Sequence, residues 1–180
     1  YILQQHDRPA FAGIAPQGYL VATEEMLLVS GGQTVPAGFD RRTGKFVHFN
    51  LHSREMGDKR GSGYHVRATK DFFVTNEHMF RMSDGAYLAR IDYPIITDNT
   101  LFSVDSAGTL HAYEHEMKIE KTKDRKGRPT VKATLHERWK AAVDPKLERL
   151  HLMAGTTLFG TGENGLIAAV DVDEESGNPT

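Results

Sequence analysis

Short apolar pairs recur along this sequence at an interval that limits the folds open to it. Each pair stands eight residues after another apolar or aromatic residue, which is the spacing of two strands joined by a tight turn. Successive pairs are 45, 29 and 57 residues apart, with a mean near 44. The pairs, each with the residue that precedes it, are Tyr19 with Leu27-Leu28, Tyr64 with Phe72-Phe73, Tyr93 with Leu101-Phe102, and Leu150 with Leu158-Phe159. The chain is therefore predicted to be built from repeated β units.

Turn residues follow the pairs at matching positions. The segments Asp40-Arg41-Arg42-Thr43-Gly44 and Ser83-Asp84-Gly85 are typical of turns, because Asp accepts hydrogen bonds from the backbone ahead of it and glycine adopts positive φ. Glycines also stand seven residues after the start of the third and fourth pairs, at Gly108 and Gly165. Each unit is predicted to run strand, turn, strand, turn, strand, turn, strand.

Four strands in a unit of about 45 residues are typical of a β-propeller blade. We therefore expect an all-β fold of about four blades, each of four antiparallel strands, forming a partial or small propeller. The predicted units cover residues 18–50, 63–92, 93–140 and 148–180 of a single propeller fragment that spans 1–180.

The third unit is long because residues 114–139 predict an elongated hairpin with a charged tip. Apolar residues alternate with charged ones on both halves of this segment, as on a strand with one buried face. A pair of helices is the alternative, because Val131, Leu135 and Trp139 lie four residues apart.

Composition removes several functional classes. The 180 residues contain no cysteine, which excludes disulfides, thiolate metal sites and thiol nucleophiles. With 22 basic and 24 acidic side chains, the net charge is −2, so there is no overall electrostatic reason to bind nucleic acid. No segment approaches the roughly 18 apolar residues of a membrane span.

The turn motifs resemble those of the quinoprotein-like (PQQ-like) propeller repeat, in which Gly, Ala, Asp, Thr-Gly and a closing Trp follow one another. Phe39 to Lys45, Gly165 to Asp171 and Ser176-Gly177 carry this resemblance, which extends from about Gly18 to Gly177 and includes uncharacterised repeat proteins of planctomycete bacteria. Trp139 resembles the closing tryptophan, with Phe49 near the corresponding place in the first unit. The structural repeat positions that the resemblance indicates are Asp40, Thr43, Gly44, Gly85, Gly108, Trp139, Gly165, Ala169, Asp171 and Gly177.

The resemblance implies two functional lines. One comprises dehydrogenases that hold pyrroloquinoline quinone (PQQ) and Ca²⁺ on the propeller axis, typically with an adjacent cysteine pair against the cofactor. The other comprises non-catalytic scaffolds, among them the lipoprotein of the outer-membrane assembly machinery.

Because this chain has no cysteine and only about four repeats, we expect a scaffold without a cofactor. Its expected partner is a protein or further blades of the same polypeptide, and a homo-oligomer is possible. A location in the periplasm or outside the cell follows from the resemblance alone.

Other readings of the sequence are weaker. A quinone-dependent oxidoreductase fragment is the first alternative function. A carbohydrate or cell-surface binding module is the second, and it depends on Tyr1, Tyr64 and Tyr87 being exposed. Neither catalytic nor cofactor-binding residues can be assigned for any of these functions.

Four clusters of chemically active residues have structural explanations. His111-Ala112-Tyr113-Glu114-His115 matches the inverted zinc-protease motif by letter, but that motif needs a helix. On the expected strand the two histidines stand roughly 13 Å apart. The other three clusters are a basic hairpin tip, a polar linker and an acidic turn, for which solvated loops are expected. Their residues are Lys121, Lys123, Arg125, Lys126 and Arg128 in the tip, His48, His52, Glu55 and Asp58 in the linker, and Asp171, Asp173, Glu174 and Glu175 in the turn.

Overall fold

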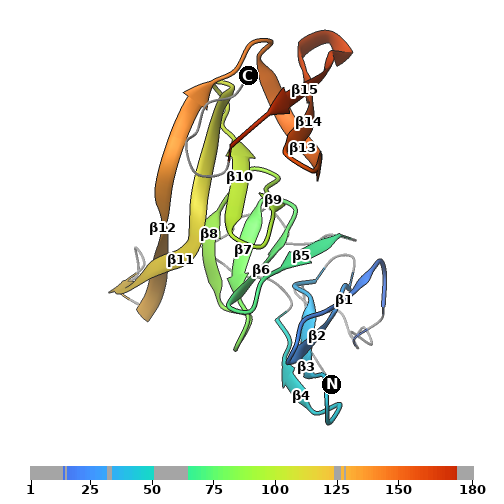
Figure 1. Ribbon diagram of the computed structural model, residues 1–180. Coiled ribbons are helices and arrows are strands. Elements are labelled where there is room, and N and C mark those ends of the chain that lie inside the picture. Colours follow the sequence, from blue (N-terminus) through green and yellow to red (C-terminus); the bar gives the residue numbers. More distant parts are fainter. Residues whose placement is uncertain are drawn as a thin grey trace. The chain divides into compact units, whose positions relative to one another are not determined.

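Four antiparallel sheets follow one another along the chain (Figure 1). The computed structural model describes residues 14, 16–31, 34–50, 65–123, 127 and 129–173. The chain divides into two compact units, residues 1–88 and 89–180.

Unit 1 contains two four-stranded sheets, each a simple meander in which every strand pairs with the next. The first sheet consists of β1 (Leu20–Ala22), β2 (Met26–Val29), β3 (Ala37–Asp40) and β4 (Phe46–His48). The second sheet consists of β5 (Val66–Ala68), β6 (Phe72–Thr75), β7 (His78–Arg81) and β8 (Tyr87–Arg90), whose last two residues fall in unit 2.

The core of unit 1 joins its two sheets. In the first sheet, Val21, Leu28, Gly38 and His48 are paired across all four strands, so they share one face. Leu28 packs in one cluster with Val35 and with apolar residues of the second sheet. These are Val66, Phe73, Phe80 and Met82.

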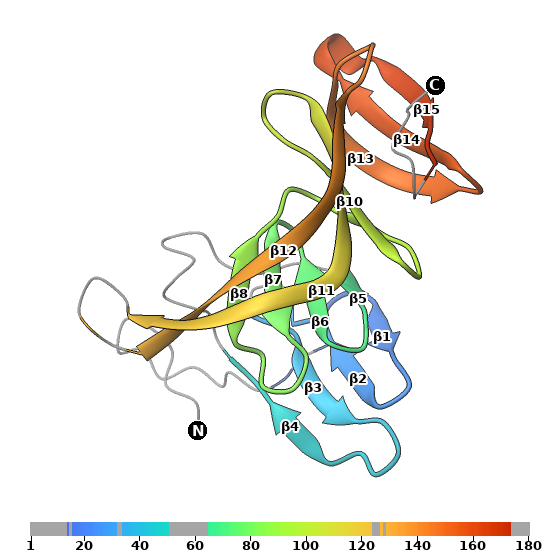
Figure 2. The same ribbon diagram turned by 60° about the vertical axis from the view of Figure 1, so that its left-hand side comes forward.

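Unit 2 contains the third and fourth sheets. The third sheet has two short strands, β9 (Ile95–Ile96) and β10 (Thr100–Val104), and two long ones, β11 (Thr109–Lys123) and β12 (Pro129–Ala142). Figure 2 shows β11 and β12 continuing as a paired hairpin well beyond β10. The fourth sheet, within the described residues, consists of β13 (Leu147–Ala154), β14 (Thr157–Gly162) and β15 (Ile167–Asp171), with a short 3₁₀ turn, η2 (Glu163–Gly165), before β15.

The core of unit 2 repeats the arrangement of unit 1. Phe102 and Ala112 from the third sheet pack with Leu150, Leu158 and Val170 from the fourth. Trp139 lies against this cluster, with its ring 5.9 Å from that of Phe102. In each unit, two successive sheets are therefore held face to face by apolar side chains.

The predicted all-β class is confirmed, and three of the four sheets have the predicted four antiparallel strands, whereas the fourth has three within the described residues. Each apolar pair lies on the second strand of its sheet, but in the second sheet the pair equivalent to Leu27-Leu28 is Phe73-Val74, one residue later than predicted. The helical alternative for residues 114–139 is wrong, because β11 and β12 form a hairpin. Of the part of the chain that the structure describes, no helix has the length and apolar character needed to cross a membrane.

Candidate functional site

The turn between β3 and β4 is built by Asp40, Thr43 and Gly44. One Asp40 carboxylate oxygen accepts hydrogen bonds from the Arg42 and Thr43 amides, at 3.0 and 2.7 Å, and from the Thr43 hydroxyl at 2.7 Å. These bonds, led by the one from the Thr43 side chain, lower the pKa of Asp40. Gly44 has a φ of +69° and closes the turn through its amide, which donates to the Asp40 carbonyl.

The second sheet forms the same turn with different side chains. Gly85, with a φ of +66°, donates to the Arg81 carbonyl as Gly44 does to Asp40. Here the carboxylate comes from Asp84, which accepts from the Ala86 amide and pairs with the Arg81 guanidinium at 2.6 Å. The Arg81 side chain holds the pKa of Asp84 below its ordinary value. Gly44 and Gly85 thus occupy equivalent positions.

Gly108 and Gly165 occupy the other repeated turn, between the second and third strands of their sheets, with φ of +84° and +76°. Beside Gly108, the Asp105 carboxylate accepts from the Thr109 and Ala107 amides, both at 2.9 Å. The hydrogen bond from Thr109 contributes most to lowering the pKa of Asp105.

A repeated threonine in the first turn was not recognised from the sequence. Thr23, Thr69 and Thr97 each place their hydroxyl oxygen 3.1 to 3.2 Å from the amide three residues later, where the second strand begins. Such turns are a common local use of Thr. The detectable signal was a Thr followed by two polar residues shortly before the first three apolar pairs, as in Thr23-Glu24-Glu25 and Thr69-Lys70-Asp71.

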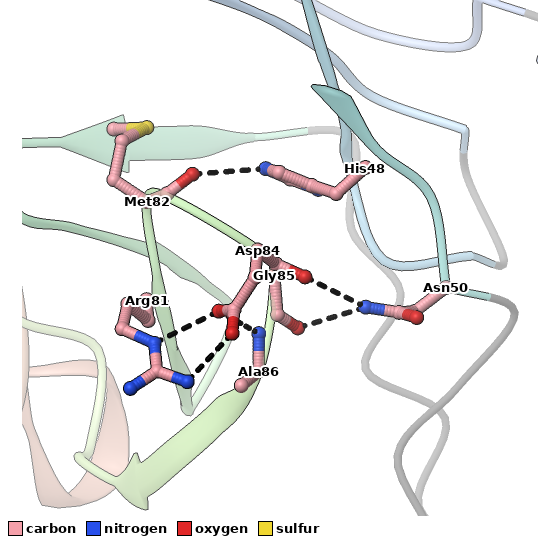
Figure 3. A network of polar contacts seen from close by, with 7 residues as sticks. All are labelled: His48, Asn50, Arg81, Met82, Asp84, Gly85 and Ala86. Atoms are coloured by element: carbon pink, nitrogen blue, oxygen red, sulfur yellow. Dashed lines mark hydrogen bonds and ion pairs between the residues drawn. The ribbon is translucent and has the colours of Figure 1, made fainter. Parts of the chain in front are cut away.

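A polar network joins the end of the first sheet to the β7–β8 turn of the second (Figure 3). His48 lies only 5% exposed, and its Nε2 donates to the Met82 carbonyl at 3.1 Å. The Asn50 amide nitrogen donates to the carbonyls of Gly85 and Asp84, at 3.0 and 3.4 Å. These bonds connect the two sheets by hydrogen bonding at the border of their apolar core.

Within this network, His48 is a titratable side chain that is buried. Its ring stacks on Phe73 at 5.8 Å, and within the described part of the chain its Nδ1 has no hydrogen-bond partner. Burial lowers the pKa of His48, so the ring is held neutral, with its proton on Nε2. The prediction that His48 belongs to a polar linker is therefore wrong, because it lies in β4. The other linker residues, His52, Glu55 and Asp58, lie outside the described residues.

His48 and Trp139 occupy equivalent places in the repeat. Across the first sheet His48 pairs with Gly38 and Gly38 with Leu28, and across the third sheet Trp139 pairs with Ala112 and Ala112 with Phe102. The first unit's counterpart of the predicted closing tryptophan is thus His48, one residue before Phe49.

His111 lies among carboxylates. Its Nδ1 is 2.6 Å from Glu137 and its Nε2 is 3.2 Å from Asp105, while its ring stacks on Tyr113 at 5.7 Å. The pKa of Tyr113 is raised, chiefly by burial. Because β11 is a strand, as predicted, His111 and His115 do not share a helix face as the zinc-protease motif requires. The His111 cluster therefore binds the hairpin strands together.

The remaining sequence candidates are dispersed. Ala169 pairs with Phe159, and Asp171 ends β15, where its carboxylate accepts a hydrogen bond from the Thr157 hydroxyl. Tyr87 is half-buried against Phe80 and His78, so the prediction that it is exposed is wrong. Lys121 and Lys123 lie exposed near the hairpin tip. Eight other residues named in the sequence analysis lie outside the described residues: Tyr1, Tyr64, Arg125, Lys126, Arg128, Glu174, Glu175 and Gly177.

Within the described ranges, no three His, Asp or Glu side chains form a group that could hold a metal ion. Asp40, Asp84 and Asp105 are instead engaged in turns. His48 and His111 are engaged in contacts between sheets and between strands. The arrangement built from Asp40, His48, Asp84, Asp105 and His111 is that of a structural framework.

The sequence matches no known protein-family profile and no curated protein. Among solved structures, BamB from Moraxella catarrhalis has a TM-score of 0.50 at 14% identity, over 86% of this chain and 43% of BamB. The chain thus spans less than half the length of BamB. The computationally designed Ika4 protein has a TM-score of 0.47 at 10% identity, over 88% of this chain and 96% of Ika4. The similarity to BamB, a β-propeller protein, supports propeller blades as the identity of the four sheets.

Proposed function

We propose that this chain is a non-catalytic β-propeller scaffold of the PQQ-like kind, which binds a protein partner or other domains of its own polypeptide. The proposal includes no cofactor, and it places the chain in the periplasm or outside the cell. Support for the scaffold comes from the blade architecture and from the structural roles of the polar groups described above.

The observation that carries the proposal is the position of the exposed apolar side chains. Leu20 on β1 and Phe46 on β4 are 60% and 52% exposed, and both strands are edges of the first sheet. Leu152 on β13 and Ile167 on β15 are 52% and 76% exposed, at the two edges of the described fourth sheet. Exposed apolar side chains on edge strands are typical of surfaces that bind other proteins.

Site-specific photocrosslinking tests the proposal. A photoreactive phenylalanine analogue is placed at Phe46 or Ile167, and at Lys118 or Lys132 as exposed controls on the hairpin. We expect discrete adducts of defined mass from the two apolar positions in extracts of the source cells, with no such adducts from the controls. Equal labelling at all four positions, or no adduct at any, would contradict the proposal.

The oxidoreductase alternative makes an opposite prediction that can be measured with the same protein. A quinone site would change the absorbance of PQQ when protein and Ca²⁺ are added. The scaffold proposal predicts an unchanged spectrum.

A further inference from the structure

The turn between β14 and β15 has positive φ at both of its central residues. Asn164 has a φ of +59° and Gly165 a φ of +76°. The turn is closed by the Leu166 amide, which donates to the Glu163 carbonyl at 3.1 Å, and by the Gly162 amide, which donates to the Leu166 carbonyl at 2.9 Å. Two positive φ values in succession are the geometry of a type I′ turn, for which Asn followed by Gly is a favoured pair. The backbone at this turn therefore favours Asn-Gly.

Asn-Gly is also the pair in which an asparagine most readily loses its side-chain amide, because glycine has no side chain to obstruct the reaction. The main-chain nitrogen of the glycine attacks the asparagine Cγ. A new N–Cγ bond forms, the Cγ–Nδ2 bond breaks, and ammonia leaves. The cyclic imide that results then adds water. Opening at Cγ gives aspartate, and opening at the main-chain carbonyl gives isoaspartate, in which the main chain runs through Cγ.

The described residues around Asn164 leave room for this reaction. Glu163, Asn164 and Gly165 are all exposed, and a Cβ built on Gly165 would meet no atom beyond its chain neighbours within 4 Å. Attack on Cγ requires Asn164 to rotate away from its ψ of 25°, so the turn must open first. Short exposed turns open at little cost in free energy. Both reacting groups belong to one dipeptide, so the reaction needs no group from elsewhere in the molecule.

The Asp84-Gly85 turn of unit 1 shows how a similar pair is protected. Gly85 also has a positive φ, but its amide donates to the Arg81 carbonyl at 2.9 Å, and the Asp84 carboxylate pairs with the Arg81 guanidinium. A Cβ on Gly85 would lie 2.8 Å from His48 Nδ1. Because Arg81 holds the Asp84 side chain in a crowded turn, we expect no imide to form there.

The other asparagines of the chain are not followed by glycine. Asn76 has a φ of +53°, close to that of Asn164, but it precedes Glu77. Asn76 is therefore an internal reference that shares the backbone conformation of Asn164 and differs in the next residue. The remaining three, Asn50, Asn99 and Asn178, precede Leu51, Thr100 and Pro179.

Isoaspartate at position 164 would change the fourth sheet, because it adds a carbon to the main chain inside the turn. The two hydrogen bonds that close the turn depend on the spacing between Gly162 and Leu166. The strand that follows is β15, whose Val170 lies in the core of unit 2. A longer turn should therefore loosen β15 from its neighbours.

We propose that Asn164-Gly165 is a site of spontaneous deamidation, at which the chain acquires isoaspartate and loses hydrogen bonding that holds β15 in the fourth sheet. The substrate is the chain itself, water is the co-reactant, and ammonia is the leaving group. The inference does not depend on the proposed scaffold function. It follows because the fold favours, at this turn, a pair of residues that is chemically labile.

Incubation of the purified full chain at neutral and mildly alkaline pH tests this inference. Mass spectrometry of its peptides should show conversion of amide to acid several-fold faster at Asn164 than at Asn76, with each site located by fragmentation. The rate should rise with pH, because the attacking nitrogen must lose a proton. An isoaspartate-specific methyltransferase should label the Asn164 peptide. No conversion at Asn164, or a rate no greater than at Asn76, would overturn the inference.

Gly165→Ala is the matched variant. Its added Cβ meets nothing within 4 Å, so it brings only backbone strain at a positive φ while obstructing the attacking nitrogen. Asn164 should deamidate several-fold more slowly in this variant, and an unchanged rate would contradict the mechanism. Circular dichroism establishes that the variant folds, and the comparison with Asn76 in the wild-type chain does not depend on it.

Hydrogen exchange of the aged chain tests the structural consequence. Protection should fall in β14 and β15 and stay unchanged in unit 1. Freshly prepared Asn164→Asp carries the new charge without the longer main chain, so it should keep wild-type protection. Equal loss in Asn164→Asp would overturn the role of the main-chain carbon, and full protection in the aged chain would overturn the loosening of β15.

Discussion

The two units pack their sheets in the same way but differ in the side chain at one position. Both join successive sheets through a large apolar residue on a second strand, Leu28 against Phe73 in unit 1 and Phe102 against Leu158 in unit 2. On the fourth strand, however, unit 1 places His48 where unit 2 places Trp139. Trp139 contributes an apolar surface, whereas His48 contributes a stacked ring with a hydrogen bond to Met82.

The difference shows which part of the repeat is interchangeable. The apolar residues of the second strand set the distance and register of the sheets, and all of those named above are fully buried. The fourth-strand residue lies at the border of the core, where either a tryptophan or a histidine ring suffices. At this position unit 1 therefore has a titratable side chain, His48, whereas unit 2 has Trp139, which does not titrate.

The largest expected effect comes from truncating the shared element. Phe73→Ala and Phe102→Ala should each lower the free energy of unfolding by about 3 to 5 kcal/mol, because each removes a fully buried ring and leaves a cavity. Hydrogen exchange on the full chain should show the loss of protection mainly in the unit that carries the substitution. Equal loss in both units from either substitution would contradict two separate cores.

Turns and strands could be predicted from the sequence, because they depend on neighbouring residue types. Strand register and contacts between distant residues could not. Asp40 with Gly44 and the glycines at 85, 108 and 165 mark turns by residue type, and apolar alternation indicates strands. The one-residue error at Phe72-Phe73 arose because both rings are apolar, so composition did not show which one begins the pair. The role of His48 depends on Met82, Phe73 and Gly85, residues that are distant in sequence, and no spacing rule connects them.

A smaller effect should distinguish two glycines with the same backbone conformation. Gly44 and Gly85 have φ of +69° and +66°, but a Cβ on Gly44 meets nothing within 4 Å, whereas one on Gly85 lies 2.8 Å from His48 Nδ1 and 2.9 Å from Asn50 Nδ2. Gly44→Ala should therefore cost about 1 kcal/mol, for backbone strain alone. Gly85→Ala should cost about 2 kcal/mol or more, because it also displaces the network that joins the sheets. Urea denaturation of both variants measures the difference, and equal costs would show that the network yields freely.

The pH dependence of stability should differ between the units. The folded-state pKa of His48 is lowered by burial, so below its ordinary value of 6.5 the unfolded chain binds a proton more readily than the folded one. The stability that the neutral ring provides is complete above pH 6.5 and falls as the pH drops through the window between the two values. A single group changes the free energy of unfolding by at most about 1.4 kcal/mol per pH unit.

His48→Gln tests this origin, because glutamine keeps a hydrogen-bond donor but does not titrate. Between about pH 5 and 7, the variant should lose less stability than the wild type. Hydrogen exchange should assign the wild-type loss to the first two sheets. An unchanged slope in the variant would place the titration in another histidine.

The smallest expected effect concerns the Arg81–Asp84 ion pair of unit 1, compared with the Lys118–Glu120 pair of unit 2. Both are short, at 2.6 and 2.7 Å, but the side chains of the first are 32% and 48% exposed and those of the second 78% and 57%. Water screens both pairs. The guanidinium of Arg81 bonds both Asp84 oxygens, which fixes the geometry of this pair better than a lysine amine can.

A double-mutant cycle with Arg81→Met and Asp84→Asn should give a coupling free energy of at most about 1 kcal/mol, and the matching cycle at Lys118 and Glu120 should give one near zero. Because the pKa of Asp84 is lowered by Arg81, the first coupling should persist as the pH falls to the ordinary carboxyl range and disappear only below it. A larger coupling at the hairpin pair would mean that exposure does not control the strength of these contacts.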